Sequence, residues 1–314
     1  MRKIPGERRE KGRQWLPVCG LLLLSLLWAV GWVRADLAPG SGAGLRLDPL
    51  CGEAVVLGLF AGPAAVVGAI LKKRWPGRTS AMKALLVGVG LFVVPAVVGV
   101  LVQDRMDDST RVALFSLTPL FAVIFEPHCG MDGAAEIRGG FVAAMIAIAG
   151  TFLVFPFELP HTYAAVGALL AVVVAAASVA AGNCLGVEIV QKRGACALTF
   201  GAVSAGSAAV LLGIAGLVDR RYGGSSAGLN AWAVSGVLAL GLLFWLMRQM
   251  SAVQMTTRFL IAPLMANVMS LGLLRPHVEV QAWIGLLLIA GGAGWMVLAP
   301  RVSDNPDMTA LGFR

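Results

Sequence analysis

The sequence is poor in charge, since Asp, Glu, Lys and Arg together make up 13% of its 314 residues. A soluble domain carries about 25%. Hydrophobic residues make up 58%, and the mean hydropathy is +0.82. This composition excludes a disordered chain, a coiled coil and an ordinary soluble enzyme, and it indicates that much of the apolar surface faces lipid. The 39 glycines fit such an environment, because glycine lets membrane helices approach closely.

Histidine and cysteine are also scarce, with three and five residues, and they form no recognisable motif. The sequence has no CxxC, HExxH, GxxxxGK[ST] or GxGxxG. We therefore expect no metal, no cofactor, no disulfide framework and no catalytic residues. The net charge of +8 does not indicate a nucleic-acid partner, because the basic residues stand in the gaps between apolar runs rather than along one face.

Apolar runs of about 20 residues, the length that crosses a bilayer, recur ten times. They lie at about 15–33, 51–71, 82–102, 109–127, 139–157, 163–187, 195–218, 229–247, 252–274 and 281–299. Several links are short and polar, which predicts antiparallel neighbours. The first run could instead be a signal peptide with Val33-Arg34-Ala35 as its cleavage box, but the 18 apolar residues from Leu16 to Val33 favour an uncleaved helix.

The distribution of Lys and Arg predicts the orientation, because cytoplasmic links collect them. With the tail 1–14 inside, 17 of the 25 basic residues fall in inside segments and seven in outside ones, and Arg258 alone stands within a span. Only six of the 25 are lysine, which indicates a GC-rich bacterial genome. We expect a multi-pass protein of the bacterial inner (plasma) membrane, with the tails 1–14 and 301–314 cytoplasmic. Lipid is one partner, and both a monomer and a homodimer fit the sequence.

Two parts of the chain resemble each other. TPLFAVIFEPH (118–128) and IRGGFVAAMIAIAGTFLV (137–154) correspond to APLMANVMSLGLLRPH (262–277) and AWIGLLLIAGGAGWMV (282–297). Pro119 matches Pro263, and Gly150 matches Gly294, both at an offset of 144. Units of five helices enter a membrane from opposite sides, as the inverted repeats of many secondary transporters do.

The predicted fold class is therefore an all-α integral membrane protein with ten transmembrane helices in two inverted five-helix repeats. The first repeat covers residues 15–157 and the second covers 158–300.

The order of motifs adds to this prediction. LLWAVGWVRADL (26–37) places tryptophan and glycine in the first helix, SLTPLF (116–121) and LIAPLM (260–265) place proline in the fourth and ninth, and glycines recur in the fifth and tenth at Gly140, Gly150, Gly285 and Gly294. In these features the chain resembles the ten-helix, EamA-like members of the drug/metabolite transporter superfamily. The resemblance implies a five-plus-five inverted repeat, both termini inside, and export of a small metabolite.

The chain departs from that family at three places. Glu126-Pro127 and Arg275-Pro276 stand where the family closes its fourth and ninth helices with glycine and glutamate, and Glu53 stands near the place of a basic residue. The substrate is therefore left open.

Polar and aromatic residues within the spans are the candidates for binding, because burying them in lipid is costly. The candidate substrate-binding or pathway residues are Trp28, Trp32, Asn183, Gln254, Arg258 and Asn267. The Arg258 guanidinium either binds an anionic substrate group such as a carboxylate, with Gln254 one turn before it, or reaches the inner headgroups or caps a helix. The asparagines either bind substrate or bond across helices. The tryptophans form either a substrate wall or an interfacial belt.

Other residues are candidates for coupling and gating. Glu126 and Glu188 are either proton carriers, since a partly desolvated carboxyl can exchange protons near neutral pH, or hydrated interfacial side chains. Glu53 with Arg34 or Arg111 forms either an outer gate or a surface ion pair. The candidate helix bends, for gating or as static kinks, are Pro119 and Pro263.

Two classes of function follow. The first is a secondary transporter that exports a small organic metabolite across the plasma membrane by alternating access. The alternative is a non-transporting membrane scaffold or a membrane-embedded enzyme. An enzyme would gather His, Asp or Glu at one membrane face, and a scaffold would carry sizeable soluble segments. The sequence shows neither feature.

Overall fold

A computed structural model describes residues 6–37, 46–47, 49–129, 134–155, 161–218, 227–228, 232–274 and 279–298. Up to residue 154 the helices are α1 Gly6–Leu37, α2 Pro49–Ile70, α3 Arg78–Gly88, the π-helix η1 Val89–Val93, α4 Val94–Val102, α5 Asp108–Phe115, α6 Thr118–Phe125, the 3₁₀-helix η2 Glu126–Cys129 and α7 Ala134–Val154. From residue 163 they are α8 Tyr163–Val187, the π-helix η3 Glu188–Lys192, α9 Ala197–Val218, α10 Trp232–Leu246, α11 Ala252–Thr256, α12 Arg258–Leu274 and α13 Val280–Leu298.

Each of the ten predicted spans corresponds to a helical segment of the described chain. Six segments are long and apolar enough to cross a bilayer, namely Pro49–Ile70, Arg78–Val102, Asp108–His128, Tyr163–Lys192, Ala197–Val218 and Val280–Leu298. Shorter apolar stretches are Trp15–Val30, Gly139–Val154 and Val234–Leu246. The prediction of an all-helical, multi-pass membrane protein is thus confirmed.

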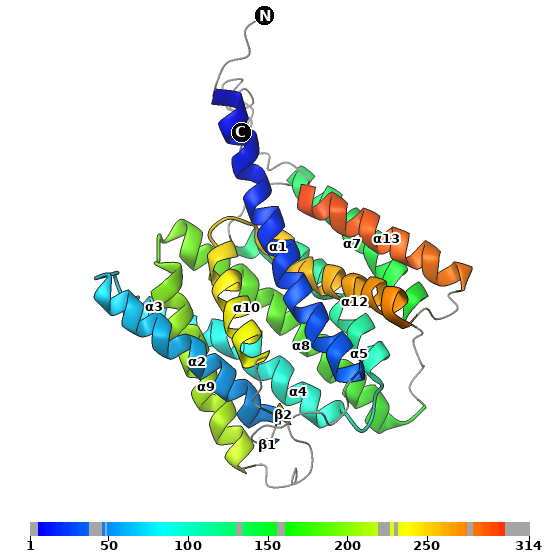
Figure 1. Ribbon diagram of the computed structural model, residues 1–314, viewed down its shortest axis with the longest axis horizontal. Helices are drawn as coiled ribbons and strands as arrows, with labels where there is room; N and C mark the ends of the chain where they lie inside the picture. The colour runs from blue at the N-terminus through cyan, green and yellow to red at the C-terminus, as the bar shows by residue number, and fades with distance from the viewer. Residues whose placement is uncertain are drawn as a thin grey trace, which may run out of the picture.

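The helices form one bundle in which α2 packs along α9 and α7 packs along α13, while α1 crosses α12 (Figure 1). Glycine allows the close approach of α7 and α13. A Cβ added at Gly150 would stand 2.6 Å from the Gly285 carbonyl oxygen, and one at Gly285 would stand 2.7 Å from the Gly150 carbonyl oxygen. Gly294, which matches Gly150 in the sequence, has no described atom within 4 Å of such a Cβ. The close contact of α7 with α13, which we call the glycine seam, is therefore formed by Gly150 and Gly285 and not by Gly294.

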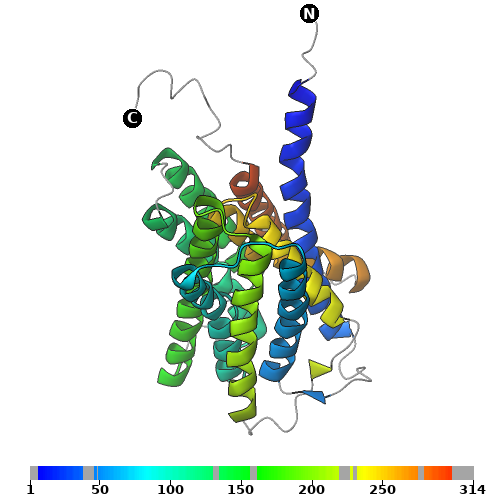
Figure 2. The ribbon, with the colours of Figure 1, turned by 90° about the vertical axis from the view of Figure 1, so that its left-hand side faces the viewer.

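The two ends of the bundle differ. Helix α1 begins and α13 ends at one end, and the strands β1 Arg46–Leu47 and β2 Ala227–Gly228 lie at the other (Figure 2). The strands pair antiparallel, with Arg46 opposite Gly228. They belong to two links that the charge distribution assigns to the same side of the membrane.

Large apolar side chains cover much of the outer surface of the bundle, and examples are Val174, Leu217 and Leu287, which is 72% exposed. In a membrane these side chains face lipid. The buried polar residues are far fewer, and the described ones are Ser25, Thr110, Ser116, Thr118, Thr151, Asn183, Thr199, Ser204, Thr256, Thr257 and Arg258. Most of them carry a hydroxyl that can donate to a carbonyl of its own helix. Among these buried residues only Arg258 carries a full charge, so the groups around it are described next.

Candidate functional site

Arg258 is the first residue of α12 and is 2% exposed. Burying a guanidinium without a compensating charge is expensive, since an ion loses its hydration and regains it only through bonds to the protein. Such a residue therefore needs either an ionic partner within the protein or a ligand that supplies one.

The guanidinium is held on one edge by neutral groups. Its Nη1 donates to Asn183 Oδ1 at 3.3 Å and to the Met255 carbonyl at 3.3 Å. The Asn183 amide is fixed in turn, because its Nδ2 donates to the Val179 carbonyl at 2.7 Å. The Arg258 Nε is buried and has no hydrogen-bond acceptor among the described residues. The Nη1 edge of the guanidinium is thus held by hydrogen bonds, and the Nε edge has no hydrogen-bond acceptor among the described residues.

Two aromatic rings lie against the same guanidinium. The Cζ of Arg258 lies 5.2 Å from the centroid of the Trp28 ring and 4.9 Å from that of Phe259. These are cation–π distances. Trp28 and Phe259 pack edge to face at 5.7 Å, and Phe115 stacks on Phe259 at 6.1 Å. Arg258 therefore lies beside a cluster of three rings, Trp28, Phe115 and Phe259, which we call the cage.

No carboxylate of the described chain lies within ion-pair distance of Arg258. The ion pairs found among these residues join Arg111 to Asp108 and Arg193 to Glu188. Among the residues that the structure describes, the charge of Arg258 is thus balanced by dipoles and aromatic rings.

The cage lies where two helices are interrupted. The first interruption separates α5 from α6 at Ser116 and Leu117, and the second separates α11 from α12 at Thr257. At each one the backbone shifts to a tighter bond between residues three apart, from Leu117 N to Leu114 O at 3.1 Å and from Thr257 N to Gln254 O at 3.3 Å.

The chemistry of each interruption explains its stability. Pro119 has no N–H for the Phe115 carbonyl, and the Thr118 hydroxyl donates to that carbonyl instead at 2.6 Å. At the second interruption the Thr257 hydroxyl donates to the Gln254 carbonyl at 2.6 Å. Helix α11 packs against α6 and α8, so the two interruptions lie close together. A 3₁₀ turn within a longer helix often marks a hinge or a strained segment.

Of the predicted pathway residues, the structure brings together Trp28, Asn183 and Arg258. Gln254 is engaged elsewhere, because it forms a capping box with Ser251 and donates from Nε2 to the Val297 carbonyl at 3.1 Å. Asn267 donates to the Pro263 carbonyl of its own helix at 2.9 Å. The side chain of Trp32 lies outside the described residues.

The predicted coupling and gating residues are dispersed. Glu188 pairs with Arg193 at 3.0 Å, and Glu126 is partly buried in η2. Glu53 is exposed on α2, while Arg111 pairs with Asp108, three residues before it. The side chain of Arg34 lies outside the described residues.

The two prolines differ in place. Pro119 stands in the first turn of α6, directly after the interruption, whereas Pro263 lies inside α12, six residues beyond Thr257. The second interruption is therefore displaced by about one turn relative to the repeat that the prolines define.

Phe115 and Phe259 are site residues that the sequence does not single out. They differ in number by 144, the offset that relates Pro119 to Pro263. The sequence signal was therefore present in LFSLTPLF (114–121) and RFLIAPLM (258–265), but one phenylalanine looks like any other in an apolar run.

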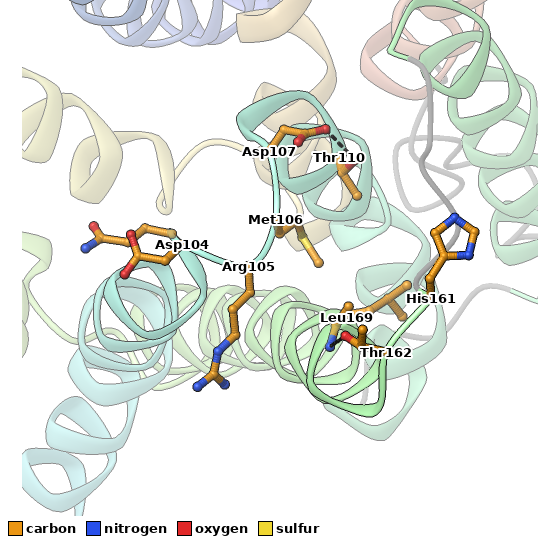
Figure 3. A pocket seen from close by; sticks show the side chains of 10 residues that line it. Asp104, Arg105, Met106, Asp107, Thr110, His161, Thr162 and Leu169 are labelled. Carbon is orange, nitrogen blue, oxygen red and sulfur yellow. Dashed lines mark hydrogen bonds between the residues drawn. The ribbon is translucent and has the colours of Figure 1, made fainter.

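A second feature is an open hollow of about 450 Å³ between the link that joins α4 to α5 and the start of α8 (Figure 3). Asp104, Arg105, Asp107 and His161 line it, and Thr110 donates to Asp107 at 3.4 Å. These four side chains are exposed and stay hydrated. The hollow does not include Arg258, and we place the candidate site at the buried arginine, where an uncompensated charge demands a partner.

No group of three His, Cys, Asp or Glu side chains in the described part of the chain could hold a metal ion.

Fold and site together define a multi-pass helical membrane protein in which, among the described residues, Arg258 is a buried cation without an ionic partner. No family model and no curated protein matches the sequence. The chain is similar to a solved crystal structure, described only as that of a protein, with a TM-score of 0.66 and 15% identity. The match covers 89% of this chain and 99% of the other. It shows that nearly the whole chain adopts a fold already seen, and it shows the fold alone.

Proposed function

We propose that this protein is a secondary transporter of the drug/metabolite transporter type, which exports a small organic metabolite across the bacterial inner membrane by alternating access. The observation that carries the proposal is the buried Arg258, which has no carboxylate partner among the described residues and lies where two interrupted helices meet.

The packing of the helices supports two inverted repeats. If spans one to five correspond to spans six to ten, each contact between two spans should recur between their counterparts. The contact of α1 with α12 should then recur between α8 and the span formed by α5 and α6. The contact of α1 with α10 should recur between α8 and the span that runs from α3 to α4. The contact of α2 with α10 should recur between α9 and α3. All of these pairs are in contact. The tightest pairs, α2 with α9 and α7 with α13, join equivalent spans to each other.

The site supports transport rather than catalysis or scaffolding. A charge that is fully desolvated and cannot relax onto a protein carboxylate is kept at a cost to stability. A ligand of opposite charge offsets this desolvation cost when it binds, and the cost returns when the ligand leaves. A buried cation of this kind is typical of a pathway within a membrane.

The test is flux in proteoliposomes that contain the purified full-length protein, using a panel of labelled metabolites with and without a pH gradient. We expect saturable flux of at least one anionic compound, which Arg258→Gln lowers strongly. The matched control is Arg248→Gln, because Arg248 is an exposed arginine. Failure of every compound to move, or equal flux in both variants, would contradict the proposal.

Proton coupling by Glu126 or Glu188 is a separate proposal. If either residue carries the proton, its change to glutamine abolishes the response of flux to a pH gradient but leaves exchange of substrate for substrate intact. The ion pair of Glu188 with Arg193 makes Arg193→Gln the companion variant. Loss of both activities together would assign a structural role to the residue.

A further inference from the structure

We infer that the site binds a monocarboxylate with a compact apolar or aromatic body, whose carboxylate lies side-on against the Nε edge of Arg258 and whose body packs on Phe115, Phe259 and Trp28. This inference deepens the proposed function and rests on it. It follows from three observations at the cage, namely the geometry of the guanidinium, the number of charges and the nature of the walls.

The geometry selects a planar, bidentate acceptor. A carboxylate matches two parallel N–H groups of a guanidinium, either at its end or along the side that includes Nε. Nη1 is taken by Asn183 and Met255, whereas Nε is buried and has no described acceptor. The side that includes Nε is therefore the one that a ligand can use.

The charges select a monoanion. The site presents one cation and, among the described residues, no anion. One negative charge neutralises it, whereas a dianion such as a phosphate monoester would leave a buried negative charge. A zwitterion would bring an ammonium group for which the described site offers no carboxylate. The N-terminus of α12, which begins at Arg258, adds a further preference for negative charge.

The walls select an apolar body. Trp28, Phe115 and Phe259 are each only partly buried, so their rings have surface that no protein atom covers. The hydroxyls of Ser116, Thr118 and Thr257 donate to backbone carbonyls and are not turned to a ligand. A flat hydrocarbon can stack on these rings. A polyol would find few hydrogen-bond partners there.

The experiment measures the melting temperature of the purified full-length protein in detergent with five small probes. They are benzoate, its neutral amide benzamide, phenyl phosphate, phenylalanine and decanoate, each at millimolar concentration. We expect benzoate to raise the Tm by a few degrees, because a ligand that binds the folded state stabilises it by mass action. Benzamide, phenyl phosphate and phenylalanine should change the Tm by less than a degree. A larger shift with decanoate than with benzoate would assign the carboxylate to a lipid-like source, and the reverse to a compact metabolite.

Two variants of Arg258 and one control variant keep the test decisive. Arg258→Gln should abolish the shift with benzoate, and Arg258→Lys, which keeps the charge but loses the Nε edge, should weaken the affinity at least tenfold. Arg248→Gln should behave as the wild type. Equal shifts in the wild type and in Arg258→Gln, or a shift with phenyl phosphate or phenylalanine but not benzoate, would overturn the inference.

The outcomes also separate this inference from the proposed function. Flux of some other compound that depends on Arg258, without any response to monocarboxylates, would refute the substrate class and leave the transporter standing. Binding of benzoate that depends on Arg258, without flux of any labelled monocarboxylate, would refute transport and leave the binding site standing.

Discussion

The two interrupted helices have the same plan but different chemistry. Each breaks beside buried hydroxyls, and each contributes one phenylalanine, Phe115 or Phe259, to the stacked pair. At the offset of 144 that relates these two rings, the residue equivalent to Arg258 is Leu114, which is 4% exposed. One half of the cage is therefore apolar and the other half carries the only charge. If the two halves are the repeats that we propose, a shared scaffold supplies the shape of the site, and the change from leucine to Arg258 supplies its chemistry.

The largest effect is expected for the charged half. Arg258→Gln should lower flux of an anionic substrate about 100-fold, because two charge-assisted hydrogen bonds at about 1.5 kcal/mol each are lost. Leu114→Met, at the equivalent position, should change flux less than threefold. Initial rates in proteoliposomes provide the measurement. Similar losses in both variants would show that the two halves are not chemically distinct.

The next test supplies the missing counter-charge from the protein itself. Asn183→Asp places a carboxylate where the Oδ1 of Asn183 now lies, 3.3 Å from the Arg258 Nη1. We expect the protein carboxylate to compete with the ligand and to weaken its binding at least tenfold, while it raises the Tm of the unliganded protein. Tighter anion binding in this variant would show that Arg258 does not provide the anion site. Asn183→Ser serves as the neutral control.

Moving the charge tests the repeat. In the double variant Leu114→Arg with Arg258→Leu, the guanidinium stands at the equivalent place beside the stacked rings. If the halves are inverted repeats, we expect about a tenth of wild-type flux, well above that of Arg258→Leu alone. Flux no higher than in that single variant would indicate that the similarity of the halves does not extend to the site.

The smallest effect is expected for the rings. Phe115→Ala and Phe259→Ala should each weaken ligand binding by about fivefold, since each removes roughly 1 kcal/mol of stacking. Because the rings stack on each other, the double variant should lose less than the sum of the two. Phe121→Ala is the control, since Phe121 stacks on Phe125 instead. Strict additivity would show that the rings act independently.

The sequence predicted the spans well, because the length of an apolar run is fixed by the thickness of the bilayer. It also singled out Arg258, Asn183 and Trp28, which the structure brings together, because polar or bulky aromatic residues are conspicuous in such runs. It did not predict the position of Gln254. Helix periodicity puts this residue on the same face as Arg258, but in the structure its side chain caps α11 and contacts Val297. The interruption at Thr257 breaks that periodicity, and the pattern Ser251-x-x-Gln254 is itself a capping signal.

Other parts of the site could not be read from the sequence. Phe115 acquires its role from a contact across 144 residues, and apolar composition alone does not distinguish it from Phe121 or Phe125. The glycine seam shows the same limit. Gly285 and Gly294 look alike in a helix, and only the crossing of α7 and α13 decides which of them meets Gly150.

The most direct test of the central claim, that Arg258 is kept for a ligand and not for the fold, is the melting temperature of Arg258→Leu with and without benzoate. Replacing an uncompensated buried charge by an apolar side chain relieves a desolvation penalty. We predict an unliganded Tm equal to or above that of the wild type, and no rise when benzoate is added. A Tm several degrees below the wild type, with the rise on adding benzoate preserved, would show that Arg258 stabilises the fold and that the anion binds elsewhere.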